Sequence, residues 1–147
     1  MTDDAEDAFA AVADELRVAI LRELWDADGP LAFSDLRGRL DVRDSGRFNY
    51  HLGKLRGRFV EQTEDGYRLT LAGRRLVGAL YSGVYTEDET VGPTPVDGSC
   101  FECGGPLRAR YEDQSAVVDC ADCGMTVVGS EMPPAFVDGR EDDLASA

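Results

Sequence analysis

The N-terminal part of the chain has apolar residues at the spacing of an amphipathic helix. Between residues 7 and 27 they recur three or four positions apart, which places them on one face of a helix. They are Phe9, Val12, Ala13, Leu16, Ile20, Leu21 and Leu24. Asp14 lies inside this run and is a good N-cap, which indicates a break into two helices. Gly29-Pro30 then ends the segment.

Two shorter helical patterns follow, joined by a turn at residues 41–44. The first is expected to begin at Ser34, and the second at Asp44 or Ser45, because these side chains cap helices well. The second is expected to continue to about Arg58. The apolar faces are Phe33, Leu36 and Leu40 in the first helix, and Phe48, Leu52, Leu55 and Phe59 in the second. Two short helices around a tight turn form a helix-turn-helix pattern.

From residue 59 onward the spacing changes to that of strands. Residues 59–63 and 67–71 alternate around Glu64-Asp65-Gly66, which predicts a β-hairpin. Thr70 is then an N-cap candidate for a last helix over residues 71–85. A hairpin directly after a helix-turn-helix is its wing. We therefore expect residues 1–85 to form a winged helix-turn-helix domain.

After residue 85 the helical spacing disappears. Residues 86–98 contain acidic residues, Pro and Gly without apolar periodicity, which predicts a linker. Residues 99–137 hold all four cysteines and three short strand-like runs, at 107–111, 116–119 and 125–128. Residues 138–147 are acidic, and we expect a disordered tail.

The charge of the chain is unevenly distributed. The net charge over 147 residues is −14, which by itself argues against a nucleic-acid ligand. Residues 36–75, however, hold ten basic and five acidic residues and carry +5. From residue 86 onward there are 14 acidic and 3 basic residues. A locally basic segment keeps DNA binding open, whereas the acidic C-terminal part suits protein contact better.

The composition also indicates where the protein works. No apolar run has the roughly 18 to 20 residues of a membrane span, and the acidic N-terminus lacks the features of a signal peptide. We expect a cytoplasmic protein without a membrane partner. One Lys against 14 Arg, among many acidic residues, resembles the proteins of extreme halophiles. An acidic protein of a mesophile is the alternative.

The four cysteines form two Cys-x2-Cys pairs, each followed by Gly. Cys100 and Cys103 are separated by 16 residues from Cys120 and Cys123. This spacing is typical of a closed tetrahedral zinc site, although a rubredoxin-like iron site uses the same ligands. Two disulfides are disfavoured in the cytoplasm. Residues 99–129 resemble a zinc ribbon, too small to fold without the energy of metal binding.

The outward face of the helix predicted from residue 44 to 58 carries the candidate DNA contacts. Gly46, Gly53 and Gly57 lie on this face, and three helix-weakening glycines there would allow a close approach to a groove. Arg and Lys read guanine edges, and Asn reads adenine edges. The candidates are Ser45, Arg47, Asn49, Tyr50, His51 and Lys54, with Arg68 of the wing on phosphate. His51 has two interpretations: packing against the wing, or base contact.

Residues 9–85 resemble ArsR-type and related archaeal winged-helix regulators. The resemblance lies in residues 13–24 (ADELRVAILREL) and 49–55 (NYHLGKL). It implies a homodimer that pairs through the first and last helices, with Phe9, Leu80, Tyr81 and Val84 in the interface. The metal-sensing cysteines of that family have no counterpart here, because the first 99 residues contain no Cys.

Together these patterns predict an α+β chain: a winged helix-turn-helix domain followed by a small β zinc ribbon. The expected function is a regulator of transcription that binds double-stranded DNA, with the ribbon as a structural or protein-interaction module. The alternative is an adaptor of the transcription machinery that does not read bases, resembling archaeal transcription factor E. An enzyme is not expected, because a closed four-cysteine site leaves no open coordination position.

Overall fold

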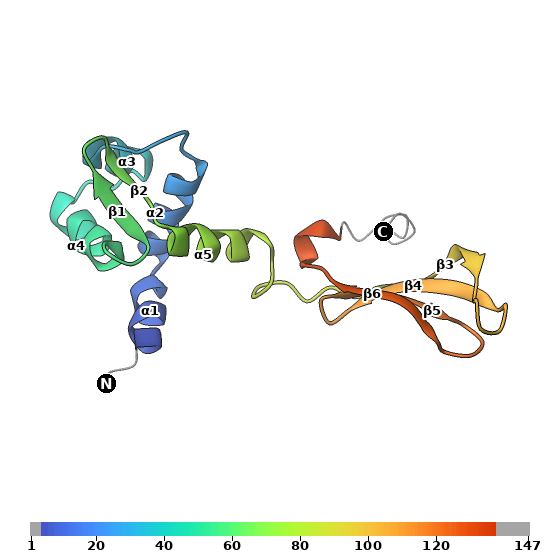
Figure 1. Ribbon diagram of the computed structural model, residues 1–147. Helices are drawn as coiled ribbons and strands as arrows, with labels where there is room; N and C mark the ends of the chain where they lie inside the picture. The colour runs from blue at the N-terminus through green and yellow to red at the C-terminus, as the bar shows by residue number, and fades with distance from the viewer. Residues whose placement is uncertain (1–3, 138–147) are drawn as a thin grey trace. The chain divides into compact units, whose positions relative to one another are not determined.

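The computed structural model describes residues 4–137 (Figure 1). Within this range the chain is α+β, with five α-helices and two antiparallel sheets. It divides into two compact units, residues 1–78 and 79–147, and each is described by itself. None of the helices in residues 4–137 has the length and apolar character needed to cross a membrane.

In the described part of the chain, the first unit contains four helices, a small hairpin and the greater part of a fifth helix, which ends in the second unit. In chain order its elements are α1 (Asp4–Val12), α2 (Glu15–Asp26), α3 (Phe33–Arg39), α4 (Ser45–Leu55), β1 (Val60–Thr63), β2 (Gly66–Leu69) and α5 (Leu71–Tyr81). The break between α1 and α2 is confirmed, because the Asp14 carboxylate accepts hydrogen bonds from the backbone N–H groups of Leu16 and Arg17. The predicted hairpin is confirmed as well, with Thr63 paired to Gly66.

Three helix boundaries differ from those predicted. α3 begins at Phe33, after Ala32, so Ser34 is not its cap. α4 ends at Leu55 rather than near Arg58, and α5 ends at Tyr81 rather than Tyr85. The early end of α4 has a local cause: Gly57 adopts φ +87°, outside the helical region, and its N–H donates to the Val60 carbonyl.

The core of the first unit is built from every helix after α1 and from the hairpin. Eight side chains are completely buried there and define the inner faces: Ile20, Leu21, Leu36, Phe48, Leu52, Leu55, Val60 and Val77. α1 contributes only partly buried residues, such as Ala11 and Val12. The inner face of α4 is therefore fixed by packing, and its other face is left to solvent.

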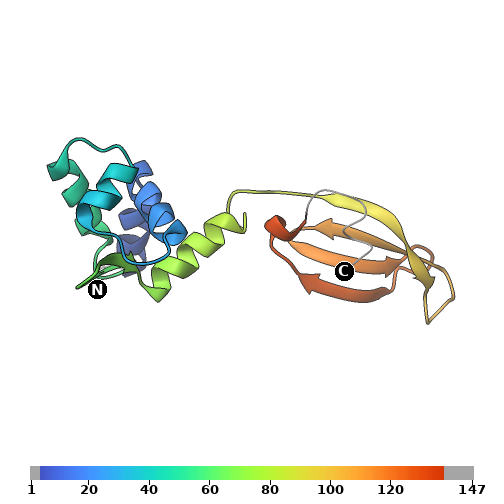
Figure 2. The same cartoon turned by 90° about the horizontal axis from the view of Figure 1, so that it is seen from above.

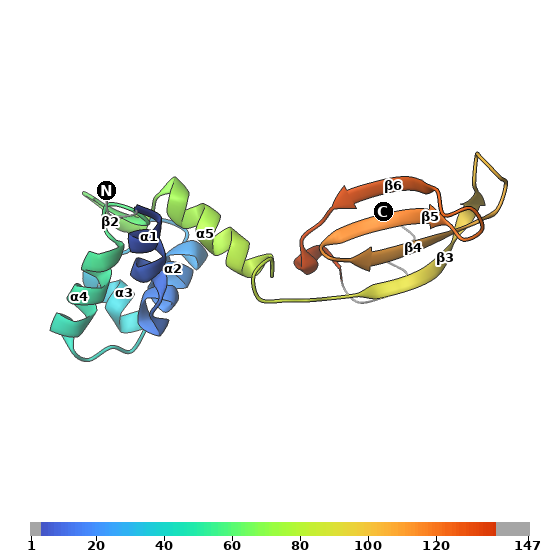
Figure 3. The same cartoon turned by 90° about the horizontal axis from the view of Figure 1, so that it is seen from below.

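The second unit is a four-stranded antiparallel sheet in the order β3-β4-β5-β6 (Figures 2 and 3). Its elements are β3 (Val91–Ser99), β4 (Pro106–Glu112), β5 (Ser115–Cys120), β6 (Thr126–Glu131) and the short 3-10 helix η1 (Pro134–Phe136). Most of the segment predicted as a linker is thus strand β3. The predicted tail at residues 138–147 lies outside the described residues.

One face of this sheet carries a small core of Ala109, Tyr111 and Val137. Tyr111 is completely buried and donates its hydroxyl hydrogen to the Met132 carbonyl at 2.7 Å. The two edges of the sheet differ. β3 carries Pro93 and Pro95 and has two register shifts against β4, whereas β6 is free of proline and exposed at all six positions.

Candidate nucleic-acid interface and metal centre

The outer face of α4 is a continuous polar surface. The helix starts where the Asp44 carboxylate accepts a hydrogen bond from the Arg47 N–H at 3.0 Å, which confirms the predicted cap. Five of the predicted DNA contacts are exposed: Ser45, Arg47, Asn49, Tyr50 and Lys54. Because Phe48, Leu52 and Leu55 are completely buried, the helix cannot rotate, and these side chains stay directed to solvent.

His51 lies at the edge of this surface and is mostly buried, with 12% of its side chain exposed. Its Nδ1 accepts a hydrogen bond from Nε of Arg17 at 3.0 Å and lies 3.6 Å from the Asp14 carboxylate. The polar partners of His51 thus come from α2 and its cap, whereas packing against the hairpin was predicted. Base contact by His51 stays a prediction. Sequence reasoning missed Arg17, because the contact joins residues 34 positions apart.

Arg68 and the three glycines of the predicted DNA-binding face remain to be placed. Arg68, on β2, is exposed, and its Nε donates to the Glu61 carboxylate of β1 at 2.6 Å. Gly46 and Gly53 lie on the exposed face of α4, and a Cβ at Gly53 would meet open space. Gly57 lies beyond the end of α4. Its positive φ accounts for a glycine at this position, so close approach to a DNA groove is not needed to explain it.

The four cysteines come from two equivalent turns. Cys100 and Cys103 lie between β3 and β4, and Cys120 and Cys123 lie between β5 and β6. In an antiparallel sheet these two connections lie at the same end. The turns repeat the same bonds: the N–H of Gly104 donates to the Cys100 carbonyl at 2.8 Å, and that of Gly124 to the Cys120 carbonyl at 3.0 Å. Both glycines have positive φ, +74° and +73°.

The four sulfurs lie close enough together to bind one metal ion. Sγ of Cys100 is 3.7 Å from that of Cys123, and Sγ of Cys103 is 3.5 Å from that of Cys120. All four lie within 4.8 Å of one another. A tetrahedron with Zn–S bonds of about 2.3 Å has S···S edges of about 3.8 Å, whereas a disulfide needs about 2.05 Å. The cluster therefore fits a metal ion such as zinc.

The acidities of the thiols agree with a cation-binding role. The N–H groups of Cys123 and Asp122 lower the pKa of Cys120 to about 7. At Cys123 the N–H of Met125 lowers the pKa, but contacts with the other sulfurs and burial outweigh it and raise the pKa to about 12. The Cys120 thiol therefore loses its proton readily, and the resulting negative charge disfavours ionisation of the neighbouring thiols. A bound divalent cation removes this conflict and favours all four thiolates.

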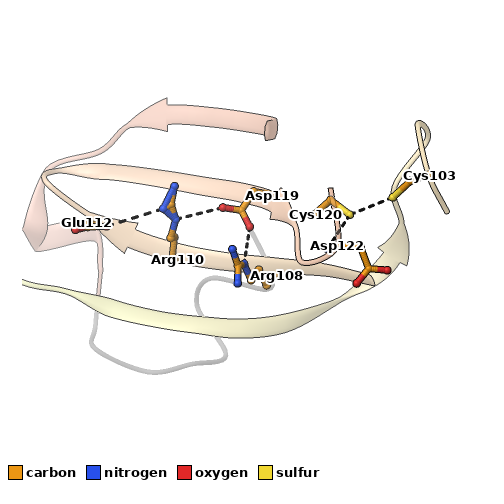
Figure 4. A network of polar contacts seen from close by, with 7 residues as sticks. All are labelled: Cys103, Arg108, Arg110, Glu112, Asp119, Cys120 and Asp122. Atoms are coloured by element: carbon orange, nitrogen blue, oxygen red, sulfur yellow. Dashed lines mark hydrogen bonds and ion pairs between the residues drawn. The ribbon is translucent and has the colours of Figure 1, made fainter. Parts of the chain in front are cut away.

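A buried carboxylate supports the strand that leads to the second pair of cysteines. Asp119, 5% exposed, accepts hydrogen bonds from Nε of Arg108 at 2.6 Å and from Nε of Arg110 at 3.4 Å (Figure 4). Arg110 also lies 3.9 Å from the Glu112 carboxylate. The network ties β4 to β5 directly before Cys120. Neither arginine was singled out in the sequence, because their pairing depends on the register of the two strands.

Comparison with known proteins assigns the chain to a family. Residues 5–80 match a family model described as a domain of unknown function (DUF7347), and the chain belongs to this family. Residues 97–147 match a second model, described as a domain of unknown function (DUF7351). No curated protein and no solved structure matches the chain. The first matched segment corresponds closely to the first compact unit, and the second lies within the second unit.

Proposed function

We propose that this protein is a DNA-binding transcription regulator whose first unit is a winged helix-turn-helix. In this assignment α3 and α4 are the helix-turn-helix, the hairpin β1–β2 is the wing, and α4 enters the major groove. The observation that carries the proposal is the outer face of α4, where Arg47, Asn49 and Lys54 are exposed over a fully buried apolar face. These side chains can pair with base edges.

The charge distribution supports the same function. The +5 of residues 36–75 surrounds α4, in a chain whose net charge is −14. Phosphate binding needs such a local excess of cations. Because residues 9–85 resemble ArsR-type regulators, we also propose that the protein is a homodimer that pairs through the first and last helices. Exposed Phe9 on α1 (75%) and Tyr81 on α5 (46%) are consistent with that pairing.

For the second unit we propose a structural zinc ion held by Cys100, Cys103, Cys120 and Cys123. Zinc bound by four thiolates has no open position for catalysis, and its binding free energy contributes to folding. Metal analysis of purified protein tests this assignment: one zinc per chain supports it, and iron with the visible absorption of a thiolate complex would contradict it. The acidic sheet then serves as a protein contact rather than a DNA contact.

Mobility shift in concentrated potassium chloride tests the function, with a duplex from the region upstream of the protein's own gene. We expect a specific shift that is lost in Arg47→Ala and in Lys54→Ala, because each substitution removes a base or phosphate contact worth about 1–3 kcal/mol. Arg22→Ala is the matched control, since Arg22 is exposed on α2 and lies outside the basic segment of residues 36–75. If the folded, zinc-loaded protein shifts no duplex, the proposal fails, and an adaptor of the transcription machinery takes its place.

A further inference from the structure

A hollow of about 640 Å³ lies beside α4 and is also bounded by α1, α2 and the segment after α4. Its charged and aromatic lining consists of Asp7, Arg17, Tyr50, Lys54, Arg56 and Arg58. Four cations and one carboxylate line the hollow, so its lining has an excess of positive charge in a strongly acidic chain. Such a concentration of cations indicates an anionic ligand.

Two of the four cations lie beside the ring of Tyr50. The Arg17 guanidinium carbon lies 5.9 Å from the ring centroid, and the Lys54 ammonium nitrogen lies 5.4 Å from it. Both distances are within the range of cation–π attraction. Arg17 is held further by bonds from its Nη1 to the carbonyls of Ala10 and Ala11, both 3.2 Å, and by the bond to His51. These contacts position the two cations before any ligand binds.

A carboxylate from outside this lining already pairs with one of its four cations. Nη1 of Arg58 donates to the Asp4 backbone carbonyl at 2.7 Å, and its Nη2 lies 3.5 Å from the Asp4 carboxylate. The Asp4 side chain is 98% exposed, so this ion pair is weak and easily exchanged. A phosphate oxygen offers the same acceptor, and its pairs with arginine are among the strong charge-assisted hydrogen bonds.

We propose that this hollow is a phosphate-binding site that takes a phosphodiester of the DNA backbone, and that Asp4 holds Arg58 until the phosphate replaces it. The inference rests on the proposed function, because the duplex that places α4 in a groove brings backbone phosphates to its side. It adds Arg17, Arg56 and Arg58 to the residues that contact DNA. A small phosphate ligand shares this chemistry, and the experiment separates the two sources.

The test uses the full-length, zinc-loaded chain and a short fluorescent duplex of random sequence, with affinity measured by anisotropy across a potassium chloride series. Arg56→Ala and Arg58→Ala should each lower the slope of log K against log salt by about 1, as loss of one phosphate contact does. Arg22→Ala, outside both the basic segment and the hollow, should leave the slope of the wild type unchanged. Asp4→Asn should tighten binding about twofold to fivefold, because it removes a competing surface ion pair.

The outcomes are distinguishable. If the wild type binds the duplex but Arg56→Ala and Arg58→Ala behave like Arg22→Ala, the site is wrong while the proposed function stands. If the wild type binds no duplex but binds pyrophosphate, and Arg58→Ala abolishes that binding, the site is real, its ligand is small, and the proposed function fails. If neither duplex nor pyrophosphate binds, the site is overturned. Circular dichroism of each variant confirms that it is folded.

Discussion

Asp14 connects the start of one helix to the edge of the predicted DNA-binding surface. Its carboxylate caps α2 and lies 3.6 Å from His51, which in turn accepts a hydrogen bond from Arg17. Partial desolvation raises the pKa of Asp14, but the N–H groups of Arg17 and Leu16 and the proximity of His51 outweigh it and lower the pKa below 3.8. The charged form is therefore favoured in the folded protein.

A lowered pKa makes the stabilising effect of Asp14 depend on pH in a defined direction. The effect is fully present above the unfolded value, near 3.8, and is lost as the pH falls through the lower folded value. Asp14→Ala should therefore be less stable than the wild type at pH 7, and the difference should shrink below pH 3.8. Urea unfolding of the helices at both pH values measures it.

Asp14→Asn is the matched control for this prediction, because an asparagine side chain can still cap a helix. It should recover part of the stability lost in Asp14→Ala at pH 7. A difference between wild type and Asp14→Ala that grows as the pH falls would contradict the assignment.

For single residues, the sequence predicts which face of a helix a side chain lies on better than it predicts which distant residue that side chain contacts. The outward positions of α4 could be predicted because the helical period is fixed once Phe48, Leu52 and Leu55 are placed inside. The bond between Arg17 and His51 could not, since it depends on how α2 and α4 pack. The DNA contacts themselves stay predictions.

At the scale of elements, the first residues of the helices are predicted better than the last residues. Asp14, Asp44 and Thr70 each bond to a backbone N–H two or three residues later, so the signal for a helix start is local. α4 ends where the backbone after it turns at Gly57, which the apolar spacing does not reveal. β3 was missed because its prolines argue against a strand, and only its pairing with β4 explains it.

Gly73 lets α5 pack closely against the end of the first unit's core. It is buried, and a Cβ added there would collide with the backbone carbonyl of Phe59, which cannot move as a side chain would. Gly73→Ala should therefore destabilise the unit by about 1–3 kcal/mol, the range typical of overpacking. Thermal unfolding followed by circular dichroism measures the loss.

Gly78→Ala, on the same helix, is the control. A Cβ at Gly78 would meet Trp25 at an ordinary contact distance of 3.8 Å. The gain in helix propensity, up to about 1 kcal/mol, should leave this variant as stable as the wild type or more so. Equal destabilisation by both substitutions would show that α5 is not packed as described.

The whole molecule consists of two units with very different amounts of core. Among residues 4–137, twelve buried residues form the apolar cluster of the first unit, and three form that of the second. A sheet with so small a core depends on other sources of stability. In the second unit these are the Asp119 network and, under our proposal, the zinc ion.

Removal of the metal should therefore destabilise the second unit and leave the stability of the first unit unchanged. With excess chelator at neutral pH, we expect the amide resonances of residues 91–131 to collapse toward unfolded positions while those of the first unit remain. Cys103→Ser should give the same result without chelator, because three thiolates hold zinc more weakly than four. A sheet that keeps its resonances after complete loss of zinc would show that it folds on its own.

The two edges of the sheet also limit how it can associate. Proline lacks the N–H that a neighbouring strand would bond, so β3, with Pro93, Pro95 and its register shifts, is closed to a further strand. Within residues 4–137, no strand pairs with the outer edge of β6, which is exposed and free of proline. Two copies could join β6 to β6 once, and both outer edges of the joined sheet would then be proline-bearing strands. Association through this sheet would end at a pair and could not grow into a fibre.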